Sequence, residues 1–305
     1  MGLFFNKKQK HSDESNESPK GKVLAFLNQK GGVGKTTMAF NVAHGLADKG
    51  HKVLCLDMDP QANLSLLCGV EDADDNIHHL LINSIRELKT LHTPVLVHDI
   101  LVKGPKLDLI AAGQDLSGFE LTIAGISVPR QTILSRFIEK NNLLHVYDYI
   151  VIDGPPTLGL LVVNIICAAN GLLVPFRPDE FSKKGLSHFY ETLENIDDMG
   201  ITEVPEVLAH IPNLVDARRR QEDDDLQLIQ SEIQKNLLGD FEESELEDIQ
   251  NRVYISKPFY NRAHLVKSLA QKKSVYEFNS KDFASLRGQF DEITHVITDW
   301  KQRQD

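Results

Sequence analysis

A glycine-rich segment near the start of the chain has the residue types and spacing of a phosphate-binding loop. The segment reads Lys30-Gly31-Gly32-Val33-Gly34-Lys35-Thr36-Thr37. Glycines let successive backbone N–H groups turn toward phosphate oxygens, and the N-terminus of a following helix adds partial positive charge. We expect Lys35 to reach the β- and γ-phosphates, Thr36 to place its hydroxyl on Mg²⁺, and Thr37 to bond an α-phosphate oxygen.

The loop contains a second lysine, Lys30, close to its start. This arrangement, K-G-G-x-G-K-T-T, is the deviant form of the Walker A motif G-x-x-x-x-G-K-[ST]. Within one subunit, Lys30 has no role that Lys35 does not already fill. We therefore expect Lys30 to act as a catalytic residue on the nucleotide of a facing subunit, as an arginine finger does, in a homodimer that binds two nucleotides.

The loop stands between a strand pattern and a helix pattern. An apolar run, Val23–Leu27, precedes it, and a helix pattern, Thr36–Lys49, follows it. The same alternation continues along the chain. Further strands are predicted at Val53–Met58, Leu107–Ala111, Tyr149–Asp153, Gly171–Pro175, Glu206–His210 and near Val253–Ile255. This pattern predicts an α/β fold with a mainly parallel, twisted sheet flanked by helices.

Aspartates stand at the ends of two of these predicted strands. Asp153 ends the fourth strand, and Asp57 and Asp59 lie at the end of the second. Because open α/β sheets bind ligands at the carboxyl ends of their strands, we expect Asp153 to hold Mg²⁺ through a water. Asp57 is expected to orient Lys30 or the metal shell. A helix-capping role is the alternative for each of these aspartates.

Several segments resemble the ParA/MinD family of P-loop ATPases with a deviant Walker A motif, and more closely its ParA branch. Besides the loop, these segments are Cys55–Asn63, Leu107–Ala112, Tyr147–Gly159, Val174–Phe176 and Lys184–Leu186. The resemblance implies binding of ATP and Mg²⁺, with Asp59 positioning the water that attacks the γ-phosphate. It also implies hydrolysis that is slow until a partner protein stimulates it. We also expect Asn213, which follows the sixth predicted strand, to bind the nucleotide.

Length and composition suit a large α/β domain. The chain has 305 residues, of which 41% are apolar and 25% charged. We expect a disordered polar extension over residues 1–22 and an ATPase domain over residues 23–305. No run of eighteen apolar residues is present, so a transmembrane span is not expected. Three cysteines without a C-x-x-C pair indicate a reduced, cytoplasmic setting.

Charge is distributed unevenly in the last third of the chain. Residues 222–248 include eleven acidic residues and one basic residue, whereas residues 252–287 include eight basic and two acidic residues. The net charge of −11 does not exclude a polyanionic partner, because binding to phosphates depends on the local field. The ParA resemblance places non-specific DNA contacts at Arg218, Arg219, Arg220, Lys257, Arg262 and Lys267. A solvated helix face is the alternative.

Two amphipathic patterns accompany these charges. Leu226, Ile229, Ile233 and Leu237 predict a helix within the acidic segment, either solvated or used for docking. The pattern of Phe283–Trp300 favours packing on the core over membrane binding. We therefore expect a nucleoid-associated partition or positioning ATPase that works with a ParB-like adaptor on a plasmid, chromosome or other large cargo. A MinD-like membrane ATPase or a small-molecule P-loop enzyme is the alternative.

Overall fold

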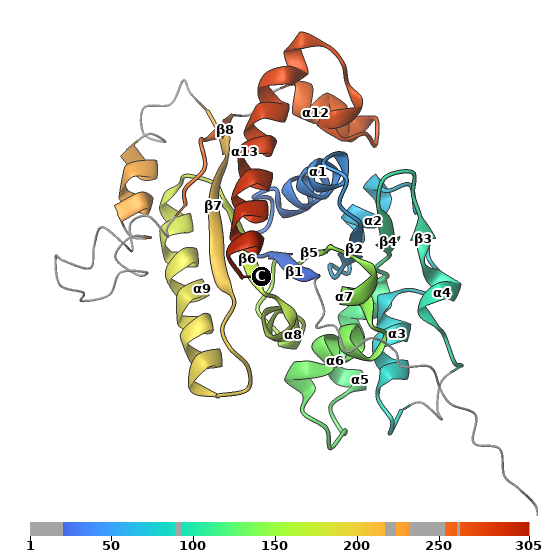
Figure 1. Cartoon of the computed structure of the whole chain (residues 1–305). Coiled ribbons are helices and arrows are strands. Elements are labelled where there is room, and N and C mark those ends of the chain that lie inside the picture. Colours follow the sequence, from blue (N-terminus) through green and yellow to red (C-terminus); the bar gives the residue numbers. More distant parts are fainter. Residues whose placement is uncertain are drawn as a thin grey trace, which may run out of the picture.

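The computed structural model describes residues 21–88, 93–216, 224–231, 233, 254–260 and 263–304. The centre of the molecule is an eight-stranded sheet with the order β3-β4-β2-β5-β1-β6-β7-β8 (Figure 1). All neighbouring strands are parallel except the pair β3 and β4. The strands are β1 (Lys22–Phe26), β2 (Val53–Asp57), β3 (Val102–Lys103), β4 (Asp108–Ile110), β5 (Tyr149–Asp153), β6 (Gly171–Phe176), β7 (Glu206–Val215) and β8 (Phe259–Tyr260).

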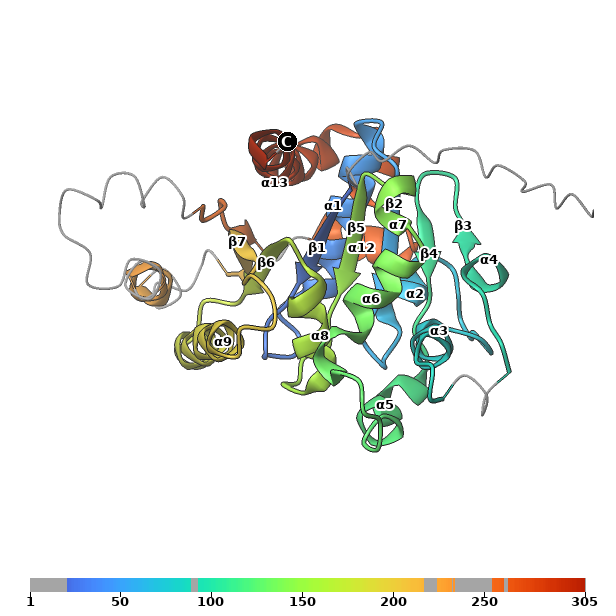
Figure 2. The ribbon, with the colours of Figure 1, turned by 60° about the horizontal axis from the view of Figure 1, so that its bottom comes forward.

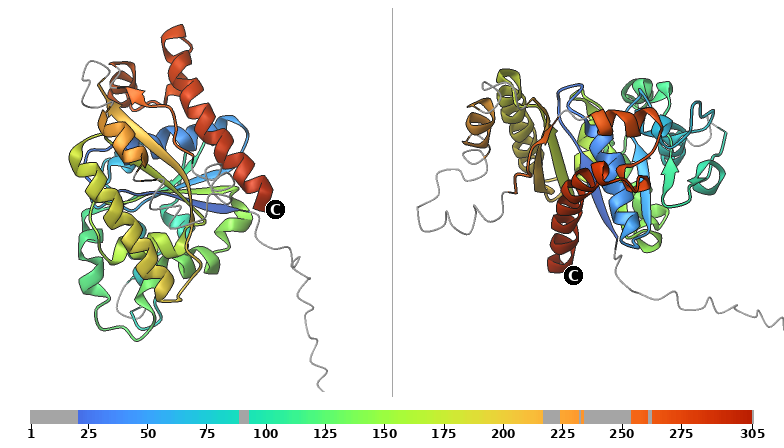
Figure 3. Two further views of the ribbon diagram at one scale, coloured as in Figure 1. Left: turned by 90° about the vertical axis from the view of Figure 1, so that its left-hand side faces the viewer. Right: turned by 90° about the horizontal axis from the view of Figure 1, so that it is seen from above.

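Helices cover both faces of the sheet (Figures 2 and 3). The α-helices are α1 (Lys35–Asp48), α2 (Asn63–Leu67), α3 (Ile77–Ser84), α4 (Val97–Ile100), α5 (Phe119–Thr122), α6 (Ile133–Lys140), α7 (Leu143–Val146), α8 (Leu160–Ala168), α9 (Glu180–Asp198), α12 (Ala263–Ala270) and α13 (Lys281–Gln304). Short 3₁₀ helices are η1 (Gln114–Gly118), η2 (Arg130–Thr132) and η3 (Val275–Glu277).

Side chains of alternate residues in the central strands pack into two separate hydrophobic cores, one on each face of the sheet. In β1, Val23 and Ala25 point into one core with α3, α6, α8 and α9, whereas Leu24 and Phe26 point into the other with α1 and α13. Because successive strand side chains point to opposite faces, a strand buried on both sides is apolar along its whole length. This explains why the strands read as continuous apolar runs, and it confirms the predicted α/β fold.

Three features of the sheet differ from the predictions. No sequence pattern indicated β3, which is two residues long and pairs antiparallel with β4. The sixth strand was predicted to end at His210, but β7 continues to Val215. Asn213 therefore lies within β7, near its carboxyl end. The predicted strand near 253–255 is wrong within the described residues, because Ile255 makes only an isolated bridge and the last strand is β8.

The two amphipathic patterns have different outcomes. In α13, Phe290, Ile293, Ile297 and Trp300 are buried against the sheet, as the sequence predicts. Residues 224–231 are helical, and Ile229 packs in the core that contains α9. Leu237 and the polar extension over residues 1–20 lie outside the described residues. Among the helices that the structure describes, none is both long and apolar enough to cross a membrane.

Candidate active site

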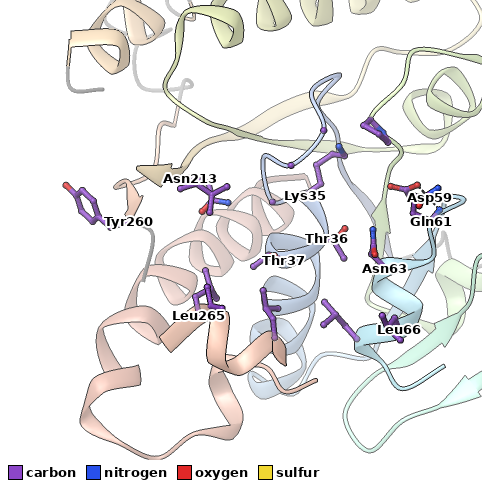
Figure 4. A pocket seen from close by; sticks show the side chains of 18 residues that line it. Lys35, Thr36, Thr37, Asp59, Gln61, Asn63, Leu66, Asn213, Tyr260 and Leu265 are labelled. Carbon is purple, nitrogen blue, oxygen red and sulfur yellow. Dashed lines mark hydrogen bonds between the residues drawn. The ribbon is translucent and has the colours of Figure 1, made fainter. Parts of the chain in front are cut away.

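A pocket of about 500 Å³ opens at the carboxyl ends of the central strands (Figure 4). The glycine-rich loop and the first turn of α1 form its floor, and Asn213 from β7 closes one side. Apolar side chains also line it, with Leu265 of α12 on the side of Asn213 and Leu66 of α2 on the side of Asp59 (Figure 4). Parallel α/β sheets bind ligands at this edge, so the fold places the pocket where the sequence predicts a nucleotide.

The backbone of the loop requires glycine at two positions. Gly32 and Gly34 have φ angles of +72° and +92°, in the left-handed region that other residues avoid. A Cβ at Gly34 would lie 2.1 Å from the side-chain nitrogen of Asn213. That nitrogen donates a hydrogen bond of 2.8 Å to the carbonyl oxygen of Val33. The close approach fixes the loop against β7, and Asn213 Oδ1 is buried without a partner among the described residues.

Lys35 places a buried ammonium group at the base of the pocket. Its side chain is 7% exposed, and Nζ lies 3.4 Å from the carbonyl oxygen of Lys30. Burial lowers the pKa of Lys35, while Asp153 and Asp59 act in the opposite direction. Since an ammonium group has three donors and this bond is long, Lys35 retains donors for phosphate oxygens.

Asp153 is a fully buried carboxylate at the end of β5. Neither of its oxygens has a hydrogen bond of standard geometry among the described residues, although the Thr36 side chain acts as a weak donor. Burial raises the pKa of Asp153 well above its usual value, and Asp57 adds to this effect, while Thr36 and Lys35 oppose it. An unpartnered buried carboxylate is costly unless a ligand compensates it.

The surroundings of Asp153 fit a magnesium ion. Mg²⁺ keeps several waters and takes one or two oxygen ligands from the protein together with phosphates. Thr36 and Asp153 carry such oxygens close to one another, and their role as magnesium ligands stays a prediction. In the part of the chain that the structure describes, no group of three or more His, Cys, Asp or Glu side chains could hold a metal by itself. A metal at this site would therefore depend on bound phosphates.

Asp57 has a different environment from the one expected. It accepts hydrogen bonds from Asp59 N at 3.2 Å, Ser65 N at 2.8 Å and Ser65 Oγ at 2.7 Å. The expected contact between Asp57 and Lys30 is absent, because the carboxylate is fully buried and turned toward the start of α2. Burial outweighs these hydrogen bonds and raises the pKa of Asp57 to about 6. Asp57 therefore shapes the segment that carries Asp59.

Asp59 lines the pocket and is 7% exposed. Its Oδ1 accepts a hydrogen bond of 3.0 Å from Gln61 N, which fixes the side chain within a tight turn. Gln61 and Asn63 line the same wall (Figure 4). These two polar residues were not named as site residues, although they follow Asp59 directly in a segment already marked by its resemblance. Their spacing after a strand-end aspartate was the available signal.

Lys30 does not line the pocket that its neighbours Gly31 and Gly32 line. Its Nζ instead forms an ion pair with Asp179, the residue that precedes α9. The two side chains are 32% and 30% exposed. Asp179 was missed because it stands 149 residues from Lys30 and no local pattern joins them.

Two of the predicted DNA-contacting residues are described, and neither lines this pocket. Lys267 is exposed on α12, and Lys257 is exposed but paired with Glu292 at 2.6 Å. Arg218, Arg219, Arg220 and Arg262 lie outside the described residues.

Comparison with known proteins places this site in a family. A family model described as an AAA domain matches residues 21–205. The chain is 34% identical over 177 residues to the sporulation initiation inhibitor protein Soj of Bacillus subtilis, covering 57% of this chain and 65% of that protein. It is 35% identical over 175 residues to the chromosome partitioning protein ParA of Caulobacter vibrioides, covering 57% of this chain and 63% of that protein.

Solved structures extend the likeness beyond the matched region. The ATP complex of a McdA variant of Cyanothece has a TM-score of 0.72 at 20% identity, covering 92% of this chain and 98% of that one. The cell division ATPase MinD of Pyrococcus furiosus has a TM-score of 0.63 at 21% identity, covering 92% and 99%. Cobyrinic acid a,c-diamide synthase of Mycobacterium smegmatis, with a bound ATP analogue and magnesium, has a TM-score of 0.61 at 28% identity, covering 69% and 80%.

The family model covers more than half of the chain. The chain belongs to the ParA/MinD family of P-loop ATPases.

Proposed function

We propose that this protein is a ParA-like partition or positioning ATPase of the cytoplasm that dimerises around ATP and Mg²⁺. In the ATP state it binds DNA without sequence preference, and an adaptor protein releases it by stimulating hydrolysis. The observation that supports the proposal most directly is the difference in position and burial between the two loop lysines. Lys35 is buried in its own pocket, whereas Lys30 lies outside that pocket and is partly exposed.

Hydrolysis in such a site depends on alignment and charge neutralisation. Lys35 and the loop N–H groups would hold the phosphates, and Asp59 would orient the attacking water. Thr36 and Asp153 would hold Mg²⁺, which when bound neutralises charge on the β- and γ-phosphates. Lys30 would complete the charge balance from the facing subunit, as an arginine finger does. A single subunit would then bind ATP but turn it over slowly.

Two substitutions separate binding from cross-subunit catalysis. Lys35→Ala should abolish ATP binding, measured with a fluorescent ATP analogue. Lys30→Ala should leave that binding within about threefold of wild type while removing the ATP-dependent dimer and its hydrolysis. Hydrolysis per subunit should rise with protein concentration in the wild type. Hydrolysis that stays linear down to monomeric concentrations, or that survives Lys30→Ala, contradicts the shared site.

DNA binding has an independent test. A random-sequence duplex should bind with ATPγS but not with ADP, and its affinity should fall steeply as salt increases, because phosphate contacts release counterions. Lys267 is exposed on α12, so Lys267→Glu should weaken this binding while hydrolysis stays close to wild type. An affinity that is insensitive to salt would contradict phosphate contacts.

Two other functions make different predictions. A MinD-like ATPase would pellet with liposomes when ATP is present, but the apolar face of α13 is packed on the core and is not available to lipid. A small-molecule P-loop enzyme is suggested by the likeness to cobyrinic acid a,c-diamide synthase. Such an enzyme would hydrolyse ATP in proportion to an added acceptor such as a carboxylate and an amide donor, and DNA would have no effect.

A further inference from the structure

The ion pair between Lys30 and Asp179 joins the glycine-rich loop to the start of α9. Lys30 belongs to the glycine-rich loop and Asp179 to the N-terminus of α9, which packs on the opposite side of the sheet from α1. Asn28 places the start of the loop beside the end of β6. Its side chain donates to the Pro175 carbonyl at 2.8 Å and accepts from Lys30 N at 2.9 Å.

The two carboxylate oxygens of Asp179 accept hydrogen bonds from different partners. Oδ1 accepts from Ser182 N at 2.9 Å and from Ser182 Oγ at 3.0 Å, and so caps α9. Oδ2 accepts from Lys30 Nζ. Capping of α9 is satisfied by the first oxygen alone, so the contact with Lys30 is an additional feature. Although partial burial would raise the pKa of Asp179, hydrogen bonds from Lys30 and Ser182 outweigh it and the pKa lies below its usual value.

This contact holds Lys30 away from the nucleotide pocket of its own subunit. The pocket lining includes Gly31, Gly32 and Lys35 but not Lys30. Both partners of the ion pair are about one-third exposed, so an approaching molecule can compete for Lys30. A triphosphate carries more charge than one carboxylate and is the stronger competitor.

We propose that Asp179 is a positioning residue that holds Lys30 within its own subunit, and that dimerisation transfers Lys30 from Asp179 to the nucleotide of the facing subunit. This inference rests on the proposed cross-subunit role of Lys30. The Asp179 contact then opposes the ATP-bound dimer, because each subunit must break it before the shared site forms. It also links Lys30 to α9, so a ligand that shifts the start of α9 would alter the availability of Lys30.

The variant Asp179→Asn tests the transfer without removing the helix cap. Asparagine caps helices as well as aspartate does, but its amide offers no negative charge to Lys30. A partly exposed ion pair changes an equilibrium by about 1.5- to 5-fold, and two such pairs break in each dimer. The dissociation constant of the dimer in ATPγS and Mg²⁺, measured by sedimentation velocity, should therefore fall by about 2- to 25-fold. Unstimulated hydrolysis at low protein concentration should rise in parallel.

Matched variants exclude structural explanations. Asp197→Asn removes one negative charge from the exposed last turn of α9 and should leave the dimer unchanged. Asp179→Ser retains a capping side chain that is too short to reach Lys30, and it should tighten the dimer as Asp179→Asn does. Damage to α9 would weaken the dimer, so a tighter dimer is a result that a purely structural role does not give.

The outcomes separate the transfer from the proposed function itself. If Lys30→Met prevents the dimer while Asp179→Asn and Asp179→Ser dimerise no better than wild type, the shared site stands and the transfer is wrong. If Lys30→Met dimerises and hydrolyses ATP like wild type, both the shared site and the transfer of Lys30 from Asp179 to the facing nucleotide are wrong. Tighter dimers from both Asp179 variants, with Asp197→Asn unchanged, support the transfer.

Discussion

The ends of β2 and β5 look alike in sequence but differ in their surroundings. Each strand is a buried apolar run that ends in an aspartate, and Asp57 lies directly beside Asp153 in the parallel register. Both side chains are fully buried. Asp57 accepts hydrogen bonds from two backbone N–H groups and one hydroxyl, whereas Asp153 has only the Thr36 side chain as a weak donor and no hydrogen bond of standard geometry among the described residues. The two aspartates are thus equally buried and occupy equivalent strand positions, but they differ in the hydrogen-bond donors and charges around them.

This difference separates a structural carboxylate from one kept for a ligand. The donors around Asp57 come from the chain itself and hold the segment from Asp59 to Ser65 in place. Asp153 is only partly compensated, by Thr36 and Lys35, and it lies beside the loop, where charge from a ligand could stabilise it further. This contrast supports Asp153, rather than Asp57, as the candidate ligand-binding carboxylate.

The largest expected effect comes from neutralising Asp153. Asp153→Asn should lower ATP hydrolysis by about 100- to 1,000-fold, because it removes the carboxylate proposed to hold Mg²⁺. Phosphate release under saturating ATP and Mg²⁺ measures this loss. Asp148→Asn, at the opposite end of β5, is the matched control. It keeps an oxygen that can accept from Lys52 N and should hydrolyse ATP like wild type.

A contrary result would remove the distinction between the two aspartates. If Asp153→Asn hydrolyses ATP within about fivefold of wild type at low Mg²⁺, then the unpartnered carboxylate at the end of β5 does not hold the metal. An equal loss in Asp148→Asn would point instead to general damage to the sheet.

The second effect concerns stability and pH in the absence of nucleotide and metal. Because the pKa of Asp153 is raised in the folded chain, the unfolded chain ionises first as pH rises above about 4. The folded state of the wild type therefore loses stability relative to Asp153→Asn by on the order of 1 kcal/mol per pH unit. The difference between the two proteins should begin at about pH 4 and grow as pH rises, until Asp153 also ionises in the folded chain.

Urea unfolding of both proteins across this range measures the difference directly. Comparing wild type with variant removes most contributions of other groups, including His44, whose pKa is lowered by burial to about 4. Its usual pKa is higher, so His44 favours the folded state as pH rises and would mask the effect in the wild type alone. If the stability of the wild type relative to Asp153→Asn stays constant or increases as pH rises, Asp153 is compensated in the folded chain.

Most of the fold could be predicted from sequence because local patterns determine it. Continuous apolar runs separated by helix patterns identified the parallel strands, and the glycines identified the loop. The short antiparallel strand β3 and the shift from residues 253–255 to β8 were not predictable, because they depend on pairing with distant strands. The wall that Leu265 of α12 contributes to the pocket also requires the folded chain.

The site was predictable in its members but not in their contacts. Lys30, Asp57 and Asp153 were identified by residue type and spacing, and nothing in those patterns distinguishes a saturated carboxylate from an unpartnered one. Asp57 was expected to orient Lys30 or the metal shell, because strand-end carboxylates of an open α/β sheet lie at the ligand-binding edge. In the folded chain, Asp57 accepts a hydrogen bond from Ser65, and Lys30 instead forms an ion pair with Asp179, which follows the neighbouring strand β6.

The smallest expected effect tests the saturated side of the comparison. Ser65 is 1% exposed; its hydroxyl donates to Asp57 at 2.7 Å and accepts from Ala112 N at 3.0 Å. Ser65→Ala removes both bonds and leaves a buried N–H without a partner, which should lower the free energy of unfolding by about 1–2 kcal/mol. Ser117→Ala, at an exposed hydroxyl that bonds only a local carbonyl, should change it by less than about 0.5 kcal/mol. Equal effects in the two variants would mean that the donors around Asp57 do not stabilise the end of β2, and that Asp57 and Asp153 differ less than their hydrogen bonds indicate.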